Sequence, residues 1–187
     1  KLMPGSAPTG IAALSLCSGG GGLDLGFAQA GIDHIASYDV LAICGRTLSS
    51  NRPSWDVRCG DLGDVSTVDW TQFSGVDVVH GGPPCQPFST AGEQRGAADD
   101  RNLWPEFIRC VTTIRPRVFV AENVVGLAAA KFEAFVRSSI IEPLSRDFEI
   151  RQFQLTAEDF GVPQRRRRVF IVGFRHADDA ARFSVPS

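Results

Sequence analysis

A short apolar segment that runs straight into four consecutive glycines constrains the fold of this chain more than any other feature. Residues 11–17 (IAALSLC) have the length and composition of a buried strand, and residues 19–22 are all glycine. Apolar residues at helical spacing follow, and this pattern ends at Gly31. A strand, a glycine loop and a helix in this order predict an α/β fold with the loop at the carboxyl end of the first strand.

The rest of the chain repeats this alternation. Predicted strands cover residues 34–38, 57–59, 76–80, 117–121, 149–155 and 169–174, and predicted helices cover residues 41–48, 103–114 and 132–144. The order indicates an open, mostly parallel sheet with helices on both faces, in which ligands bind at the carboxyl ends of the strands. A polar segment at residues 90–101 is long enough to form a functional lid over such a site.

Length and composition indicate one domain. With 187 residues, of which 43% are hydrophobic and 21% charged, the chain can bury a core of its own. We expect residues 1–10, rich in Pro, Gly and Ser, to form a disordered tail and residues 11–187 to form the domain. No apolar stretch reaches the roughly 18 residues of a membrane helix, and no apolar run marks a signal peptide, which favours a cytoplasmic protein.

Cysteines and charges narrow the class further. Five cysteines without a Cys-x-x-Cys pair indicate a reduced intracellular chain rather than a zinc ribbon, so we expect no metal. The net charge of −2 argues against a self-sufficient nucleic-acid binder. Residues 1–100 carry 5 basic and 11 acidic side chains, whereas residues 101–187 carry 14 and 10. We therefore expect an anionic partner to bind the second half.

The glycine loop fits neither common phosphate-binding pattern. Counted from Gly19, the dinucleotide pattern G-x-G-x-x-G fails at Asp24, and no Gly-Lys-Ser/Thr follows for a P-loop. Asp39 lies 20 residues beyond Gly19, where a carboxylate accepts hydrogen bonds from ribose hydroxyls, and Asp61 could accept from an adenine amino group. A flexible turn with two surface aspartates is the simpler alternative. Together, however, the positions favour a nucleoside ligand without a phosphate clamp, and S-adenosylmethionine fits best.

A proline-framed cysteine follows the predicted strand at residues 76–80. Cys85 stands in the segment GGPPCQPFS, and prolines on both sides hold a reacting sulfur rigidly, so we predict that it is a nucleophile. The other four cysteines are interpreted as inert core residues. A cysteine hydrolase would need a histidine partner, and none of His34, His80 and His176 has a recognisable setting; His80 is interpreted as a strand-end residue.

Charged residues flank two later strands. Glu122 ends an apolar segment, which suggests a carboxyl group that donates or shares a proton, although a helix cap or a solvated side chain is the alternative. Residues 165–168 are all arginine and lead into the last strand. Because alternate residues of an extended chain point the same way, we expect Arg166 and Arg168 to share one face. One pair of arginines could then enter the site while the other meets phosphates or solvent.

Taken together, these segments resemble the catalytic core of DNA (cytosine-5) methyltransferases. The matching segments are LSLCSGGGGLDLGF, GD, GGPPCQPFS, AENV and FGVPQRRRRVFIVG, in the order of the family and spanning residues 14–174. The resemblance implies a Rossmann-like methyltransferase sheet whose last strand is antiparallel. It also implies S-adenosylmethionine as methyl donor, S-adenosylhomocysteine as product and double-stranded DNA as partner.

The resemblance assigns roles residue by residue. Cys85 would attack carbon 6 of a cytosine flipped out of the duplex, Glu122 would interact with the ring nitrogen N3, and Arg168, together with Arg166, would hold the base. Residues 90–101 match the mobile catalytic loop of the family. Nine residues would hold the cofactor: Ser18, Gly19, Gly21, Asp39, Val40, Asp61, Leu62, Pro83 and Leu103. Ser18, Gly19 and Gly21 would line its methionine part. Asp39 would hold the ribose and Asp61 the adenine.

The sequence departs from the family pattern at three places. Cys17 replaces a common phenylalanine, and Val40 replaces a bulkier stacking residue. The target-recognition domain and the last two motifs would lie beyond Ser187, so we expect apolar surface where they would pack. The expected function is cytosine-5 methylation of DNA in a prokaryotic cytoplasm, near the nucleoid and in a restriction-modification context. The alternatives are a non-autonomous or inactive subunit of a split methyltransferase and a tRNA cytosine-5 methyltransferase, although the Cys-Phe-Thr signature of the latter is absent.

Overall fold

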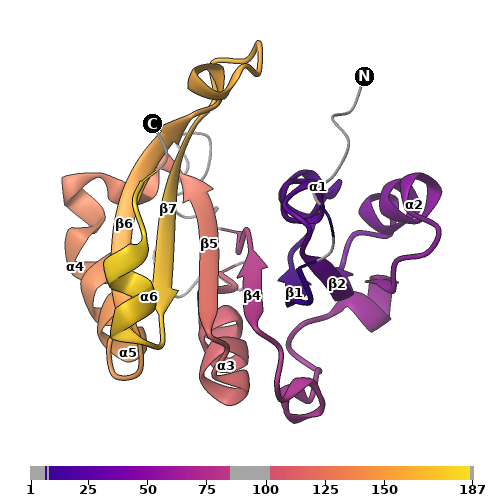
Figure 1. Cartoon of the computed structure of the whole chain (residues 1–187), viewed down its shortest axis with the longest axis horizontal. Helices are drawn as coiled ribbons and strands as arrows, with labels where there is room; N and C mark the ends of the chain where they lie inside the picture. The colour runs from indigo at the N-terminus through magenta and orange to yellow at the C-terminus, as the bar shows by residue number, and fades with distance from the viewer. Residues whose placement is uncertain (1–6, 8, 85–101, 186–187) are drawn as a thin grey trace.

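A seven-stranded sheet forms the centre of the molecule in a computed structural model that describes residues 7, 9–84 and 102–185 (Figure 1). Its strand order is β3-β2-β1-β4-β5-β7-β6. The strands are β1 (Ala12–Leu16), β2 (Asp33–Asp39), β3 (Val57–Cys59), β4 (Val78–Gly81), β5 (Val118–Val124), β6 (Glu149–Thr156) and β7 (Arg167–Phe174). β7 runs opposite to the other six strands, so the expected mostly parallel sheet with an antiparallel last strand is confirmed.

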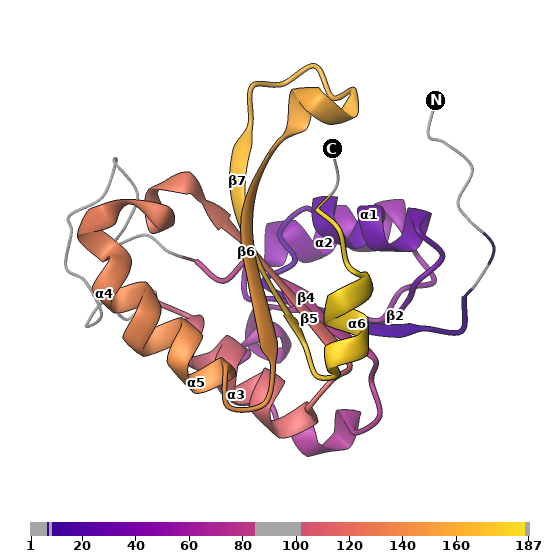
Figure 2. The same cartoon turned by 60° about the vertical axis from the view of Figure 1, so that its left-hand side comes forward.

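Helices cover both faces of the sheet. Figure 2 shows α3, α4 and α5 on one face and α1, α2 and α6 on the other. Their bounds are α1 (Gly22–Gln29), α2 (Ala42–Asn51), α3 (Trp104–Ile114), α4 (Glu133–Val136), α5 (Glu142–Leu144) and α6 (Ala177–Arg182). Short 3-10 turns are η1 (Gly60–Gly63), η2 (Trp70–Phe73), η5 (Val125–Ala128), η6 (Ala130–Phe132) and η8 (Ala157–Phe160). Within the described ranges, no helix has the length and apolar character needed to cross a membrane.

The main core lies between the sheet and α3. This helix buries Trp104, Phe107, Val111 and Ile114, whose spacing of three or four residues places them on one face. Phe107 meets Phe119 of β5 edge to face, with 6.2 Å between ring centroids. Because this side of the sheet is densely packed, the carboxyl ends of the strands are held in fixed positions.

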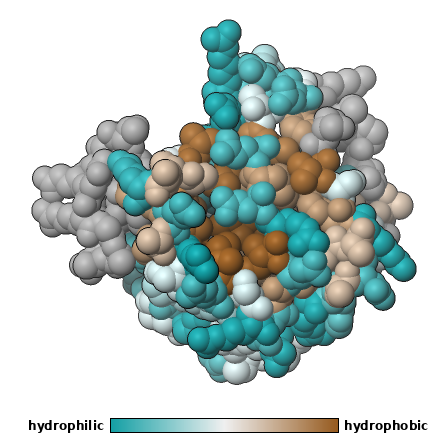
Figure 3. Space-filling model, turned by 90° about the vertical axis from the view of Figure 1, so that its left-hand side faces the viewer, coloured by the Kyte–Doolittle hydropathy of each residue, from teal (hydrophilic) through white to brown (hydrophobic). Residues whose placement is uncertain are grey.

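The opposite face of β5, β7 and β6 is less completely covered. A small apolar cluster surrounds α6, and beside it lies a depression of about 260 Å³ with apolar lining only: Val118, Val120, Phe153, Leu155, Phe170, Val172, Phe174 and Phe183. Figure 3, which faces the β6 side of the molecule, shows hydrophobic residues gathered at the centre of that face inside a hydrophilic rim. The molecule therefore exposes apolar surface in the described part of the chain.

Two helices differ from the sequence-based expectation. The predicted helix at residues 132–144 is interrupted by a π-helical segment, Arg137–Ile141, directly before α5. Pro143 explains the interruption, because its ring cannot fit against the carbonyl group four residues earlier in a regular α-helix. The short helix α6 was not predicted, since six residues are too few for a clear apolar pattern.

Strand β5 extends farther than predicted. It pairs in parallel with β4 only as far as Ala121, which lies opposite Gly81. Beyond that point Glu122 and Val124 pair with Phe170 and Arg168 of the antiparallel β7. Glu122 therefore lies inside a strand at the place where the neighbouring strand β4 has already ended. The antiparallel direction of β7 brings the beginning of that strand, with its arginines, to the same edge.

Candidate active site

The glycine loop is joined to the end of β2 through Asp39. The amide of Gly19 donates to Asp39 Oδ2 at 2.7 Å, and the amide of Leu41 donates to Oδ1 at 2.8 Å. Gly19 and Gly21 have positive φ angles of 56° and 82°, a backbone conformation that other residues rarely adopt. A Cβ on Gly21 would also lie 2.2 Å from Leu48 Cδ2, so the Leu48 side chain would have to move. The loop thus requires glycine at these two positions for its backbone conformation.

A pocket of about 450 Å³ opens beside this loop at the carboxyl ends of the strands. It is lined by Cys17, Asp39, Val40, Leu41, Gly63, Asp64, Val65, Gly82, Pro84 and Leu103. Gly63 approaches the end of β2 so closely that a Cβ would lie 2.2 Å from the Asp39 carbonyl oxygen. The two chain segments can therefore form one pocket wall only with glycine at this position.

The lining of this pocket fits a nucleoside-like group. Val40, Val65 and Leu103 supply apolar walls, Asp39 supplies a carboxylate, and the described lining contains no lysine or arginine to bind phosphate. Burial, and secondarily the charge of Asp39, raises the pKa of the Cys17 thiol to about 12. Cys17 therefore contributes an uncharged thiol to the pocket lining at neutral pH.

Three of the nine predicted cofactor residues, Asp39, Val40 and Leu103, line this pocket. Gly19 and Gly21 lie in the loop beside it. The Ser18 hydroxyl is engaged within the protein, by the Tyr38 carbonyl at 3.2 Å and the Ser15 hydroxyl at 2.9 Å. The other predicted residues do not line it: Pro83 lies between the lining residues Gly82 and Pro84, and Asp61 and Leu62 are exposed in η1.

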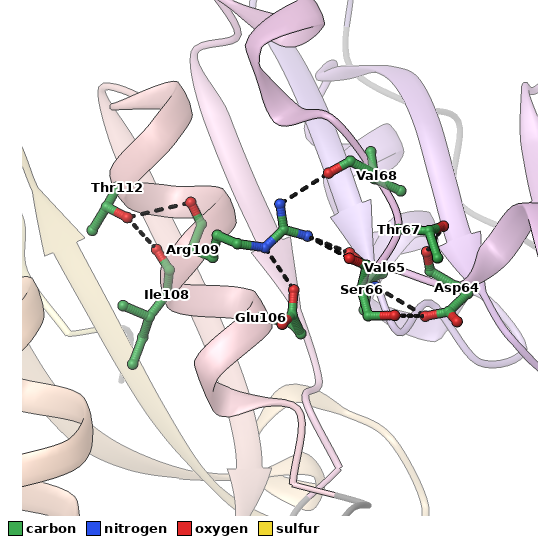
Figure 4. A network of polar contacts seen from close by, with 9 residues as sticks. All are labelled: Asp64, Val65, Ser66, Thr67, Val68, Glu106, Ile108, Arg109 and Thr112. Carbon is green, nitrogen blue, oxygen red and sulfur yellow. Dashed lines mark hydrogen bonds and ion pairs between the residues drawn. The ribbon is translucent and has the colours of Figure 1, made fainter.

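Asp64 and Val65 also line this pocket, although they were not predicted from the sequence, and an arginine on α3 positions them (Figure 4). Arg109 donates to the carbonyl oxygens of Val65 at 2.7 Å and Val68 at 2.9 Å, and pairs with Glu106 at 2.7 Å. Asp64 Oδ1 accepts hydrogen bonds from the amide and hydroxyl groups of Ser66, which holds the turn. One wall of the pocket therefore depends on a side chain more than 40 positions away in sequence.

A carboxylate and two guanidinium groups meet at the adjacent edge of the sheet. Glu122 Oε1 lies 2.9 Å from Arg168 Nε and 3.2 Å from Arg166 Nη2. Arg167 points to the other face and donates to Gln154 at 3.1 Å. The predicted alternation of the arginine run is thus observed for these residues. This trio lines a second pocket of about 370 Å³, with Gly22, Leu23, Leu155, Ala157, Phe160 and Phe170.

The segment after β4 separates the two pockets. Gly82 and Pro84 line the first pocket, while Glu122 Oε2 lies 3.5 Å from the position of a Cβ on Gly82. The buried side-chain amide of Asn123 donates to the Pro83 carbonyl at 2.9 Å and holds this segment in place. The predicted nucleophile Cys85 follows Pro84 directly but lies outside the residues that the structure describes. The predicted catalytic loop, residues 90–101, lies outside them as well.

Comparison with known proteins gives consistent matches. Residues 11–187 match the family model described as C-5 cytosine-specific DNA methylase. The Type II methyltransferase M.NgoMIV of Neisseria gonorrhoeae is 39% identical over 164 residues, which cover 87% of this chain and 51% of that protein. M.AquIA of Picosynechococcus sp. is 37% identical over 176 residues, covering 87% and 71%. The chain spans about half the length of the first curated relatives it matches.

Solved structures agree with the fold. An Escherichia coli prophage protein assigned as a DNA modification methyltransferase has a TM-score of 0.76 and 29% identity, covering 94% of this chain and 49% of that one. A mutant of Spodoptera frugiperda DNMT2 has a TM-score of 0.69 at 24% identity, covering 88% and 50%, and supports the fold alone.

Proposed function

The chain belongs to the C-5 cytosine-specific DNA methylase family, and from this premise we propose that it carries the catalytic half of a DNA (cytosine-5) methyltransferase. The observation that carries the proposal is the position of Glu122. Its carboxylate is held by Arg166 and Arg168 on one side and lies against the segment leading to Cys85 on the other. A nucleoside-sized pocket adjoins the same segment.

The residues of the chain divide the proposed chemistry between them. The Cys85 thiolate adds to carbon 6 of a flipped-out cytosine, and the electron pair of the ring double bond moves toward carbon 5 and N3. Glu122 interacts with N3 and stabilises the charge that develops there. Arg166 and Arg168 orient Glu122 and the base. Carbon 5 takes the methyl group that S-adenosylmethionine would supply. The carbon 5 proton then passes to water, the electron pair of that C–H bond restores the double bond, and the Cys85 thiolate leaves.

The cofactor assignment rests on the lining of the first pocket. Asp39 would hold the ribose, Val40 and Leu103 the base, and Ser18, Gly19, Gly21 and Pro83 would lie at the methionine side, with Asp61 and Leu62 at the adenine edge. S-adenosylmethionine supplies an electrophilic methyl group for carbon 5 of the cytosine. An acidic, largely apolar pocket whose described lining holds no basic residue suits this nucleoside better than a nucleotide.

Double-stranded DNA is the proposed partner, and a part of the relatives' length that this chain does not cover would supply target recognition. Such a part could be joined to this chain or act as a separate subunit. Because the substrate is chromosomal DNA, we place the reaction in the prokaryotic cytoplasm, beside the nucleoid. The Type II names of the relatives favour a restriction-modification context.

The decisive experiment uses methyl-labelled S-adenosylmethionine and mixed DNA. We expect label in 5-methylcytosine with the unmodified chain and with Cys59→Ser, a matched loss of a thiol outside the site, but none with Cys85→Ser. If the chain alone gives no label, the downstream polypeptide of its gene is added. Recovery would support a split or two-part enzyme, and continued absence of label would refute the catalytic assignment.

A further inference from the structure

Three residues outside the proposed active site converge beneath α1. Asp24 comes from α1, His34 from β2 and His80 from β4, and one potential ligand atom from each lies within 4.8 Å of the others. The two histidine Nε2 atoms are 2.7 Å apart. Asp24 and His80 are fully buried, whereas His34 is partly exposed. The proposed methyl-transfer chemistry uses none of the three.

Small residues on the strand between the histidines make this convergence possible. Strand β1 separates β2 from β4, and its Ala13 lies opposite His34 while its Ser15 lies opposite His80. Partners in parallel register share a face of the sheet, so all four side chains point toward α1. Larger residues at positions 13 and 15 would fill the space in which the imidazole rings meet.

The cluster leaves polar atoms unsatisfied in the described part of the chain. Asp24 Oδ1 accepts a hydrogen bond from the Ser37 hydroxyl at 2.8 Å, but Asp24 Oδ2 and the Nδ1 atoms of both histidines have no partner. If one neutral imidazole donates from Nε2 to the other, the acceptor carries its proton on a buried Nδ1 without a partner. Phe27 stacks on His80 at 4.2 Å and adds no polar group. Buried groups of this kind are costly unless something compensates them.

We propose that Asp24, His34 and His80 form a binding site for a divalent transition-metal ion, with Zn²⁺ as the best-suited ion. Two imidazoles and one carboxylate are a frequent zinc ligand set, which a water molecule commonly completes to four. Two nitrogen ligands of a tetrahedral zinc ion stand roughly 3.3 Å apart. The rings therefore separate by about half an ångström on binding and exchange their mutual hydrogen bond for metal bonds. The Asp24 carboxylate gains a partner for its unpaired oxygen, while both histidines carry their proton on Nδ1.

A metal ion at this position would have a structural role. It would fix the start of α1, which carries the glycine loop at its N-terminal end, to β2 and β4. The sequence offers no signal for such a site, because the ligands are 10 and 46 positions apart and follow no metal-binding spacing. This explains why the cysteine and histidine patterns predicted no metal.

The test measures metal binding directly and needs no methylation activity. The full chain, stripped with a chelator and kept reduced, is titrated with Co²⁺ by visible absorption and with Zn²⁺ by thermal unfolding. We expect one tetrahedral Co²⁺ per chain without thiolate charge-transfer bands, and a higher Tm with Zn²⁺ but not Mg²⁺. The variants His34→Gln and Asp24→Asn should bind more than about 100-fold more weakly, because loss of groups that merely orient ligands already costs 10–100-fold.

His176→Gln provides the matched control, since His176 is exposed at the start of α6. It should bind as the unmodified chain does. Circular dichroism establishes that each variant is folded, and the partly exposed His34 is the safest position to change. Absence of saturable binding, binding that His34→Gln and Asp24→Asn leave intact, or charge-transfer bands indicating cysteine ligands would each overturn the proposal.

Discussion

At the scale of the residue, Glu122 shows how two neighbouring chain segments determine what one side chain does. Arg168 and Arg166 both contact its Oε1 atom, which leaves Oε2 directed toward Gly82. The side chain is 22% exposed, so it is accessible to a ligand in the second pocket while its position is constrained. A carboxylate fixed in this way is preorganised for contact with a substrate ring.

Glu122→Gln tests this arrangement. The amide keeps the size of the side chain but weakens both ion pairs and alters the group presented to the base. We expect methyl transfer to fall by about 100-fold or more, while S-adenosylmethionine binding, measured by calorimetry, changes little because Glu122 does not line the first pocket. Glu149→Gln, at the far end of β6, should behave as the unmodified chain. A few-fold loss of rate only would refute the assigned role.

At the scale of the element, Arg109 connects α3 to the wall of the first pocket. Its guanidinium group contacts the carbonyl oxygens of Val65 and Val68 and lies 5.7 Å from the ring centroid of Trp70. The planar fork of arginine suits several carbonyl acceptors at once, and a lysine cannot reproduce this geometry. The position of this pocket wall therefore depends on the hydrogen bonds that Arg109 makes to it from α3.

Arg109→Ala should lower the free energy of unfolding by about 1–3 kcal/mol, because hydrogen bonds to a charged donor are lost and the carbonyl oxygens are left to solvent. It should also weaken S-adenosylmethionine binding. Arg109→Lys should recover part of the stability but little of the binding. Urea unfolding and calorimetry measure the two effects, and a variant with unchanged binding would contradict the positioning role.

The features of the site that depend on local pattern can be predicted from the sequence. The glycine loop, Asp39 at the end of β2 and the alternation of Arg166 and Arg168 follow from strand direction and the period of two. Asp64 and Val65 could not be predicted, because their place depends on a packing contact from Arg109. The same holds for the extension of β5 through Glu122, which results from pairing with a strand some 45 positions later.

At the scale of the whole molecule, the apolar depression on β5, β7 and β6 should bind hydrophobic molecules. Its lining is entirely apolar, and exposed patches of this kind mark interaction surfaces or cause association. We expect the chain to bind a hydrophobic dye or to self-associate in sedimentation experiments. Phe153→Gln should reduce this, whereas Val185→Gln, exposed outside the depression, should not. A monomeric chain that binds no dye would contradict the expectation.

Stability should also fall at alkaline pH. Burial, and secondarily Asp39, raises the pKa of Cys17 from 9.0 to about 12, and burial likewise raises the pKa values of Cys110 and Tyr38. Above about pH 9 the unfolded chain loses these protons while the folded chain keeps them, so the free energy of unfolding decreases as the pH rises toward 12.

Urea unfolding under reducing conditions between pH 8 and pH 10.5 would measure this decrease. Each such group contributes up to about 1.4 kcal/mol per pH unit. Cys17→Ser should lessen the slope, and Cys59→Ser provides the comparison for loss of a thiol. A midpoint independent of pH would show that the buried groups do not titrate in this manner.

The four consecutive arginines that lead into β7 would by themselves leave the choice of ion pairs open by one residue. After a slip of one residue past β5, Arg165 and Arg167 would stand where Arg166 and Arg168 stand now, and Glu122 would still face two positive charges. Gly173 excludes this slip, because it lies opposite Phe119 and a Cβ at its position would be 2.0 Å from the Phe119 ring. Which arginines reach Glu122 is therefore decided at the other end of the strand, by a glycine five positions beyond Arg168.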